Sequence, residues 1–598
     1  MSFDEESQSL LSPLSTPPPN ESYRNSRLRY QLLRCVCLPS KPAVVLICLA
    51  IIVGAVQKIF SVMCGAIFLF VVGGHYVSEL WAAIISYLLL SVTVFLYPAS
   101  GFLADVFCGR FKIMIISMSL FIVSFVLLPA ALGLVLMNPQ LYPFHLSSVK
   151  LICFSVIILF FSLAFWLGIT SYHANFIQFG LDQLMEAPSE HLSLFIHWII
   201  WADSVASAVV VPLTATLLCR RYYPHVRVIF GTLPIICLIS LIALMIVGFK
   251  KRHWFRTELF RQRNPYKSVF NVLSFASQHR HPLQRSAFTY CDDEKPSRLD
   301  FAKERFGGPF TTEQVEVVKV LFRILTILLV LGPIFVLYLP NSLIGFALIS
   351  VHISHEGLYY CHSSWILLES GALKYITSTI FFPIYTCIIL GRKRIPKMFV
   401  RLGFGIVILL LGVLYFLVID VTGHSLNQVH IRINDSTLCM LNVELGGLRI
   451  HVPSLGMHWA FLIPANVLFG IGPLLIMTTI FEFISAQSPH TMKGLVIGLF
   501  LTIKTLFELL GALGLIPFSL SVFWKSDYIQ EHSPLINCGF GYLLSVSVIA
   551  VIGFVLYLVA AKRYKYRVRD DRPYDHRFAI DYYSRTIQER EREVVPSV

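Results

Sequence analysis

The chain has 598 residues, of which 56% are hydrophobic and 14% charged, and its mean hydropathy is +0.71. A soluble domain carries roughly 25% charged residues, so this composition excludes a soluble globular protein and indicates several membrane spans. The net charge of +14 does not indicate nucleic-acid binding, because Lys and Arg stand in short blocks between apolar runs. The thirteen cysteines form no CxxC or metal-ligand series, so neither a disulfide framework nor a metal site is expected.

Residues 1–42 form a polar segment without the apolar run and cleavage site of a secretory signal. We expect a disordered cytosolic tail here. Glu6, followed after three residues by Leu10 and Leu11, resembles an acidic dileucine sorting signal. Clathrin-adaptor proteins read such signals and carry membrane proteins to endosomes and lysosomes. The alternative is a chance match in a Ser- and Leu-rich tail.

Twelve apolar runs follow, each long enough to cross a bilayer as a helix of about 20 residues. They lie near 43–72, 76–98, 112–137, 150–172, 191–217, 228–249, 318–339, 364–390, 398–419, 457–484, 492–518 and 539–561. The first and fifth runs are interrupted by charges, at Lys58 and Asp203. The sequence therefore predicts an all-α membrane protein with about 12 transmembrane helices.

The basic residues predict the orientation of these spans. Thirteen Lys and Arg lie in residues 250–316 and ten in residues 562–598, and such blocks stay on the cytosolic side. Both termini are therefore expected in the cytosol. The 250–316 linker separates a six-helix bundle at 43–249 from a second at 317–561. Asn434 begins an Asn-Asp-Ser sequon in a loop that this topology places outside, so a glycan is expected there.

Four motifs stand at the ends of these spans. The second span is followed by a G-x-x-A-D-x-x-x-G-R string, which contains Gly101, Asp105, Gly109 and Arg110, and the fourth ends in "HANFIQFGLDQL" with Asp182 and Gln183. "LDFAKERFGG" followed by "VEVVKVLFRIL" precedes the seventh span, and "FEFISAQSPHTMKGLVIGLF" closes the tenth. In this order they resemble the proton-coupled oligopeptide transporter family of the major facilitator superfamily, with details similar to its peptide/histidine branch.

The resemblance implies two six-helix bundles that rock about a central binding site. It also implies a conformational role at the bundle ends for the motif residues Gly101, Asp105, Gly109, Arg110, Asp182 and Gln183. Glu482 matches the glutamate that meets the amino group of a peptide or amino acid in the family. A carboxylate within a membrane span is a functional candidate by default; the alternative is a structural ion pair, with Lys58 as a candidate partner.

The first span departs from the family's E-x-x-E-R-F pattern. Gly54 and Gln57 stand at the two glutamate positions and Lys58 at the arginine position. Glutamine has no titratable proton, and lysine keeps the charge but loses the bidentate geometry of arginine. In the fifth span Trp198 is kept and Ser204 replaces an asparagine, so we expect substrate contacts from Glu482, Lys58, Trp198 and Ser204.

Proton coupling is placed in doubt by these replacements, and its candidates are Asp203, His173 and Glu482. Asp203 is a candidate to neutralise Lys58 from another helix, and His173 stands where the family has a basic residue. A histidine that only satisfies a backbone group is the alternative for His173. The other charges within apolar runs are Glu369, Lys504 and Glu508, and the last two are spaced to pair locally as i and i+4.

The sequence contains no Walker A, HExxH or GxSxG motif, so neither an enzyme nor an ATP-driven pump is expected, and no cofactor. We expect a multi-pass transporter of di- and tripeptides, histidine or related amphoteric solutes, in endosomal, lysosomal or plasma membranes. Its partners would be the solute, the lipid bilayer, protons if coupled, and adaptor proteins, with no nucleic acid. The alternative is a transporter-derived receptor or scaffold that signals through its cytosolic segments.

Overall fold

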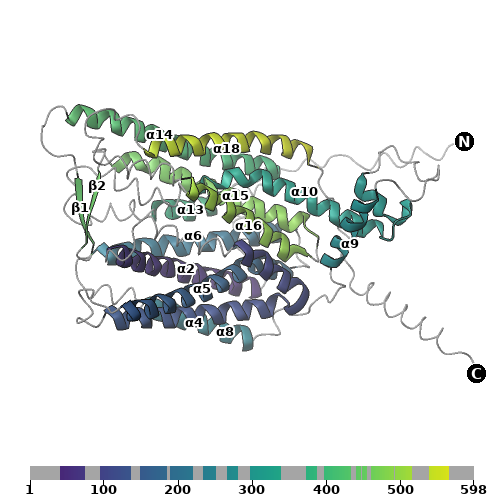
Figure 1. The fold of residues 1–598 in the computed structure, drawn as a ribbon, viewed down its shortest axis with the longest axis horizontal. Coiled ribbons are helices and arrows are strands. Elements are labelled where there is room, and N and C mark those ends of the chain that lie inside the picture. The colour runs from purple at the N-terminus through teal and green to yellow at the C-terminus, as the bar shows by residue number, and fades with distance from the viewer. Residues whose placement is uncertain are drawn as a thin grey trace, which may run out of the picture.

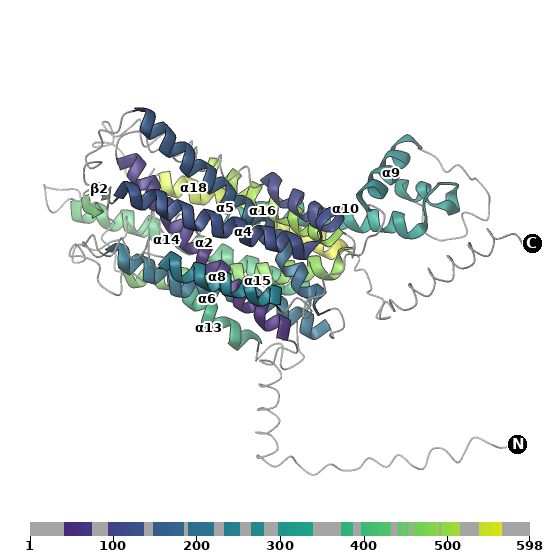
Figure 2. The ribbon, with the colours of Figure 1, turned by 90° about the horizontal axis from the view of Figure 1, so that it is seen from below.

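The computed structural model describes residues 41–73, 94–136, 148–184, 189–219, 233–250, 265–279, 297–338, 372–386, 396–431, 440–445, 448–453, 459–489, 492–514 and 538–564. Most of this part of the chain is helical, and the long helices run side by side along one axis (Figure 1). We name the end of the molecule at which α9 lies the linker end. The hairpin of β1 and β2 lies at the opposite end (Figures 1 and 2).

Before the linker, the helices are α2 (Lys41–Gly73), residues 94–103 continued by the π-helical η1 (Ala104–Cys108), α4 (Arg110–Leu136), α5 (Ser148–Asp182), α6 (Ser189–Cys219) and α8 (Leu233–Lys250). After it come α10 (Thr312–Phe335), α13 (Ala372–Tyr385), α14 (Met398–Ile431), η10 (Trp459–Leu462), α15 (Ile463–Gln487), α16 (Lys493–Leu513) and α18 (Cys538–Arg563). Strands β1 (Met440–Leu445) and β2 (Leu448–Pro453) pair antiparallel, with Met440 opposite Pro453.

Seven of the described helices are long and apolar enough to cross a membrane. They comprise residues 43–60, 191–213, 312–335, 398–419, 463–487, 493–511 and 543–563. Described helices coincide with eleven of the twelve predicted runs, and the described part of the run at 76–98, residues 94–98, is helical as well. The structure thus confirms a nearly all-helical fold with helices suited to a membrane, while the count of twelve spans stays a prediction.

Apolar side chains cover both the inner and the outer faces of these helices. Phe60, Phe165, Phe335 and Phe500 are buried in the core. On the outer face of α8, Ile235, Ile236 and Ile239 are each more than half exposed. On α18, Val551, Ile552 and Val555 are exposed as well. Water-soluble proteins rarely present such continuous apolar faces to solvent. Helices that contact lipid do present them.

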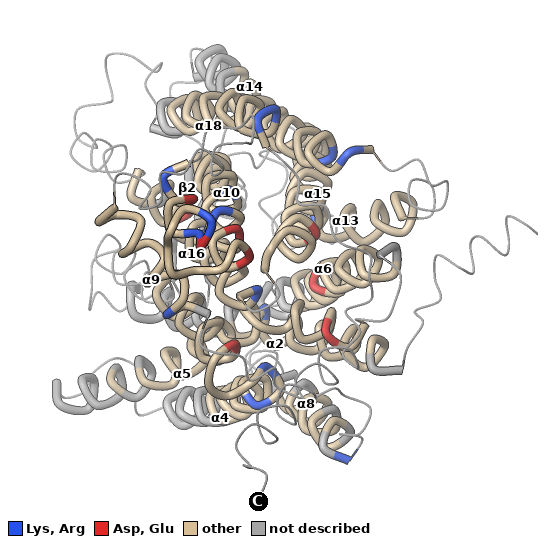
Figure 3. Tube along the Cα trace, turned by 90° about the vertical axis from the view of Figure 1, so that its right-hand side faces the viewer, with Lys and Arg blue, Asp and Glu red and all other residues tan. Residues whose placement is uncertain are grey.

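The helices before the linker form one group and those after it a second (Figure 1). The groups meet where α6 packs on α13 and α15, and where α16 packs on α5 and η1. Charged residues are sparse along the helices in the view onto the linker end (Figure 3). The exact bounds of the two predicted bundles stay a prediction.

The linker contains a small folded unit built on the start of α10. It comprises α9 (Pro265–Gln278) and the 3₁₀ turns η6 (Arg298–Ala302) and η7 (Glu304–Phe306). Val272 of α9 and Ala302 of η6 are buried against Val315 and Val318 of α10. Thr311 caps α10 by accepting a hydrogen bond from the Gln314 backbone N–H at 3.4 Å. This unit extends α10 beyond the helix groups (Figure 2).

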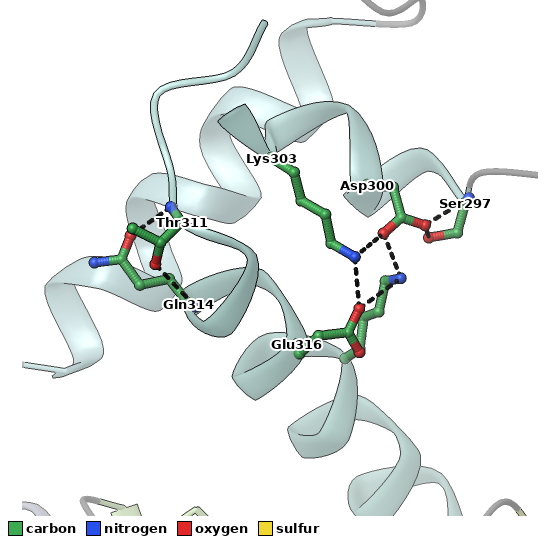
Figure 4. A network of polar contacts seen from close by, with 7 residues as sticks. Ser297, Asp300, Lys303, Thr311, Gln314 and Glu316 are labelled. Carbon is green, nitrogen blue, oxygen red and sulfur yellow. Dashed lines mark hydrogen bonds and ion pairs between the residues drawn. The ribbon is translucent and has the colours of Figure 1, made fainter. Parts of the chain in front are cut away.

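An ion-pair network ties η6 to α10 (Figure 4). Asp300 Oδ1 lies 2.7 Å from Lys303 Nζ and 2.5 Å from Lys319 Nζ. Both lysines also contact Glu316, at 2.7 and 3.2 Å. Burial of Asp300 opposes its ionisation, but the hydrogen bonds from Lys303, Lys319 and Ser297 hold the pKa of this carboxyl below its usual range. The sequence predicts a basic linker that contains the LDFAKERFGG motif, but it does not predict this network of ion pairs.

Candidate functional site

The Asp105 carboxylate joins three parts of the chain at the linker end. Its Oδ2 accepts hydrogen bonds from the Leu495 backbone N–H and from the Tyr266 hydroxyl, each at 3.1 Å. Its Oδ1 lies 2.7 Å from Arg110 Nη2, and the side chain is 1% exposed. Leu495 is in the first turn of α16, where unpaired N–H groups and the helix dipole attract an anion. Asp105 therefore connects the first helix group both to the second and to α9.

Arg110 extends this connection within the first group. Its Nη1 pairs with the Asp182 carboxylate at the end of α5. Gln178 donates to the same carboxylate at 2.7 Å. Gln183, in contrast, donates to the Phe179 carbonyl of its own helix at 3.1 Å. Of the predicted motif residues, the structure thus brings Asp105, Arg110 and Asp182 together, with Gln183 beside them.

Glycines let the two groups approach closely at this point. A Cβ atom at Gly101 would lie 2.4 Å from the Gly494 carbonyl oxygen, and one at Gly494 would lie 2.8 Å from Asp105 Oδ1. Gly109 has a φ of 78°, which side chains with a Cβ adopt only with strain. Gly101 therefore allows the backbones of the two helix groups to touch, and Gly109 allows a turn with a positive φ.

Aromatic residues fill the contact between α6 and α13. Trp201 Nε1 donates to the Thr379 carbonyl at 3.1 Å, and the ring of Trp198 lies 5.6 Å from that of Phe382. The indole N–H of Trp198 is buried without a hydrogen-bond partner. The hydroxyl of Ser204 is turned toward its own helix, 3.5 Å from the Ile200 carbonyl. Of the two predicted substrate contacts on this helix, only Trp198 has a free polar group.

A second polar cluster lies between α2, α6 and α13. Lys58 Nζ is 5.3 Å from the ring centroid of Tyr375, an arrangement typical of a cation–π contact, and it interacts electrostatically with Asp203. Asp203 Oδ1 lies 3.1 Å from the position of a Cβ at Gly54. The carboxylate on α6 therefore stands beside the place where the resembled family carries a glutamate on α2.

His173 belongs to the same region. Its Nε2 lies 3.2 Å from Gln57 Oε1, so Nε2 carries the proton in this contact, and the ring interacts electrostatically with Asp203, Lys58 and Lys504. Lys504 pairs with Glu508 at 2.6 Å, as predicted from their spacing. Two of the three predicted proton-coupling candidates, Asp203 and His173, thus share one cluster with Lys58.

Glu482 lies apart from that cluster. Its Oε2 is 2.8 Å from Arg401 Nη2 on α14, and the Arg401 side chain is 5% exposed. The ion pair considered as an alternative for Glu482 is present, but its partner is Arg401 and not Lys58. The sequence alone does not single out Arg401, because this residue stands in the first turn of an apolar run, where a basic residue is expected from the orientation rule alone.

Some predictions lie outside the described residues. These are the tail residues Glu6, Leu10 and Leu11, the sequon residue Asn434, and Glu369. Within the described part of the chain, no group of three or more His, Cys, Asp and Glu residues is arranged to hold a metal ion.

Comparison with known proteins identifies relatives along most of the chain. No family model matches it. Solute carrier family 15 member 3 of Mus musculus is 23% identical over 524 residues, which cover 81% of this chain and 85% of that protein. The Rattus norvegicus protein of the same name is 23% identical over 533 residues, with the same coverage. The chain is a divergent relative of solute carrier family 15 member 3.

Solved structures share its fold. An auto-inhibited POT family peptide transporter matches with a TM-score of 0.51 at 17% identity, over 88% of this chain and 98% of that one. The POT family transporter PepTSo matches with a TM-score of 0.53 at 14% identity, over 92% and 98%. A POT family transporter solved with 5-aminolevulinic acid matches with a TM-score of 0.50 at 11% identity, over 88% and 97%. These likenesses confirm the predicted fold.

Proposed function

We propose that the protein is a secondary transporter that moves small amphoteric solutes across a membrane by alternating access. The solutes are di- and tripeptides, histidine or related compounds. The observation that carries this proposal is the pair of charged clusters inside a fold of the POT type: Lys58 with Asp203 in one, and Glu482 with Arg401 in the other. Charges inside membrane spans are expensive and generally serve a pathway.

The charges also suit a solute that carries both an amino and a carboxylate group. Lys58 offers a cation to the carboxylate, and Glu482 offers an anion to the amine. Glu482 is held by Arg401 at 2.8 Å, so an incoming amine competes with the guanidinium for it. One structural neighbour was solved with 5-aminolevulinic acid, a compound that carries both groups.

In this proposal the two helix groups rock about these clusters. The Asp105 contact with Leu495 at the linker end holds one side closed and opens when the groups separate. Proton coupling, if it operates, uses Asp203, His173 or Glu482, because Gln57 has no titratable group.

Uptake into proteoliposomes tests the proposal. Purified protein is reconstituted, and uptake of labelled histidine and of a labelled dipeptide is measured with and without a pH gradient. We expect saturable uptake that Lys58→Ala reduces by at least about tenfold, since a lost charge-assisted contact costs roughly 1.5–3 kcal/mol. Lys267→Ala, an exposed lysine of α9, is the control. Correctly folded protein that takes up no amphoteric solute would exclude transport of this class.

The folded linker unit favours one alternative, a receptor or scaffold that signals through this unit. The Tyr266 contact with Asp105 would link the position of the linker unit to the positions of the helix groups. Binding of a cytosolic partner to the linker unit, undiminished by Glu482→Ala and without measurable uptake, would support this alternative over transport.

A further inference from the structure

Two opposite charges stand within the apolar part of α16. Lys504 Nζ lies 2.6 Å from Glu508 Oε1, and the two side chains are 20% and 21% exposed. Because the residues are four apart, they share one face of the helix. Residues two positions away lie on nearly the opposite face, and that face carries exposed leucines, at Leu506, Leu510 and Leu513. The charged pair therefore points to the inside of the protein, and the leucines point outward to lipid.

A buried hydroxyl without a partner lies beside this pair. Lys504 Nζ is 5.4 Å from the ring centroid of Tyr338, three residues beyond the end of α10, at the distance of a cation–π contact. The hydroxyl of Tyr338 is buried and has no hydrogen-bond partner among the described residues, although a buried tyrosine hydroxyl normally finds one. On the same helix, Thr502 donates to the Val94 carbonyl of the first helix group at 2.8 Å. The pair therefore stands close to the boundary between the two groups, next to a polar group that lacks a partner.

A structural role does not account for the pair. Opposite charges at i and i+4 add little to the stability of a helix, whereas each charge placed within a membrane span is costly. Two apolar side chains would fill the same positions without that cost. Ionisable residues that face the inside of a membrane protein generally mark a pathway for solutes or ions. The pair is therefore expected to bind something that the other described residues do not supply.

We propose that Lys504, Glu508 and Tyr338 form a subsite for the zwitterionic head of a free amino acid. Glu508 binds the ammonium group, and Lys504 binds the carboxylate, to which the Tyr338 hydroxyl also donates. The two charges of the protein are adjacent, so they match two ligand charges carried by the same carbon atom. Each peptide unit moves the carboxylate of a peptide roughly 3.8 Å further from its amine. A di- or tripeptide therefore satisfies only one of the two charges at a time.

The inference rests on the proposed transport function and narrows its solutes to free amino acids. It also makes Glu508 the anion for the amine in place of Glu482. In this arrangement Glu482 keeps its ion pair with Arg401 at 2.8 Å, so no guanidinium has to be displaced when the solute binds.

The test measures ligand binding by the full-length protein in lipid nanodiscs, with each standard L-amino acid and its dipeptide with glycine as probes. We expect at least one free amino acid to bind, at least about tenfold more tightly than its dipeptide, because the dipeptide loses one charge-assisted contact. Lys504→Met and Glu508→Gln should each weaken this binding at least about tenfold, and Tyr338→Phe about threefold or more. Lys562→Met, an exposed lysine at the end of α18, is the matched control. Binding of no free amino acid, or equal binding by the pair variants, overturns the inference.

Analogues of the bound amino acid separate recognition from stability. The decarboxylated amine should be bound less tightly by Glu508→Gln but equally well by Lys504→Met, and the deaminated acid should show the reverse. The double variant Lys504→Glu with Glu508→Lys keeps an i, i+4 pair on the same face, so its thermal stability should match wild type. Its binding of the amino acid should fall at least about tenfold, because the order of the charges is reversed. An exchanged pair that binds as wild type does would assign the pair a structural role, and this variant decides if the single variants do not fold.

Uptake into proteoliposomes separates the inference from the proposed function. Binding of a free amino acid that is lost in Lys504→Met and Glu508→Gln, without uptake of any amphoteric solute by the wild type, upholds the subsite and rejects transport. Uptake of a dipeptide that stays unchanged in both variants, without binding of any free amino acid, upholds transport and overturns the subsite.

Discussion

Gly54 and Asp203 illustrate how a single pair of residues changes the chemistry of the first span. The acid that the resembled family carries on this helix is absent, and Asp203 of α6 stands in its place, with Oδ1 3.1 Å from where a Cβ at Gly54 would lie. The same Cβ would lie 3.1 Å from that of Ala206. The glycine and the aspartate are therefore complementary in space, and Lys58 keeps an anionic neighbour.

We predict that Gly54→Ala lowers the stability of the protein, because the added methyl would lie 3.1 Å from Asp203 Oδ1 and from Ala206 Cβ, closer than van der Waals contact. Gly248→Ala in α8 is the control, since a Cβ there meets nothing within 4 Å. The control should stabilise by about 0.5–1 kcal/mol, the gain of alanine over glycine in a helix. Thermal unfolding in detergent measures both. Equal unfolding temperatures of the two variants would contradict a steric effect at Gly54.

Individual residues also mark the limit of prediction from the sequence. Asp105, Arg110 and Asp182 were identified because their motif has a fixed spacing, and the structure brings them together. The role of Arg401 could not be predicted, because its partner Glu482 lies on a helix that is far away in the sequence. A carboxylate in a span calls for a partner, but the spacing along one chain does not say which of several cations on other helices it meets.

At the scale of the elements, α9 is the least expected feature. The segment was interpreted as a basic linker, yet Tyr266 at its start donates to Asp105 at 3.1 Å and packs on Phe102 with ring centroids 4.8 Å apart. The long helices, in contrast, were predictable, because about 20 consecutive apolar residues have few alternatives in a membrane. A short amphipathic helix has no such constraint, and its docking depends on tertiary contacts.

We predict that Tyr266→Phe weakens the closed contact at the linker end. The variant keeps the ring but loses one hydrogen bond to a carboxylate, worth about 1.5 kcal/mol or roughly a tenfold change in the closed-to-open ratio. Distances between fluorophores placed across this end measure the change in this ratio. The reactivity of a cysteine introduced by Leu495→Cys is a second measurement. Tyr415→Phe, which removes a hydroxyl bonded to the Phe461 carbonyl at 2.9 Å, is the matched control and should leave the ratio unchanged. An equal effect of both variants would mean that the change is not specific to this contact.

We predict that Asp300→Asn loosens the linker unit from α10. The carboxylate holds Lys303 and Lys319 together, so its loss leaves Glu316 as the one carboxylate described between two ammonium groups. Backbone amides of residues 265–279 and 297–310 should exchange hydrogen about tenfold faster, equivalent to ~1.4 kcal/mol. Glu304→Gln, an exposed neighbour, is the control.

Acid should act on the same network. The pKa of Asp300 is lowered by its bonds in the folded protein, so its contribution to stability is complete above the ordinary aspartate pKa of about 4 and is lost as the pH falls through the lower folded value. The protection of backbone amides in the linker unit against hydrogen exchange should therefore not change between neutral pH and about pH 5 in the wild type. A loss of protection in that window would assign the effect to another group.

At the scale of the whole molecule, the predicted dileucine signal in the tail leads to a prediction about the compartment. If Glu6, Leu10 and Leu11 form a sorting signal, Leu10→Ala combined with Leu11→Ala should move the protein from endosomes and lysosomes to the plasma membrane, because adaptor recognition requires both leucines. Surface biotinylation measures the shift. Leu14→Ala, in the same tail, is the control. An unchanged distribution of the double variant would exclude this signal as the determinant of location.

The orientation of the molecule rests on its basic residues, with thirteen in residues 250–316 and ten in residues 562–598. Moving either block across the bilayer is strongly disfavoured, so we predict that both lie on the cytosolic side and that the loop containing Asn434 lies on the opposite side. Only that side meets the glycosylation machinery. We therefore predict a glycan on Asn434, removed by Asn434→Gln and by Ser436→Ala and detected as a shift in mobility after glycosidase treatment. Asn20 is followed by Glu and Ser and forms a second sequon in the tail, so Asn20→Gln should change nothing. A glycan on Asn20 would show that the protein has the opposite orientation. The linker unit would then lie outside the cytosol, out of reach of any cytosolic partner.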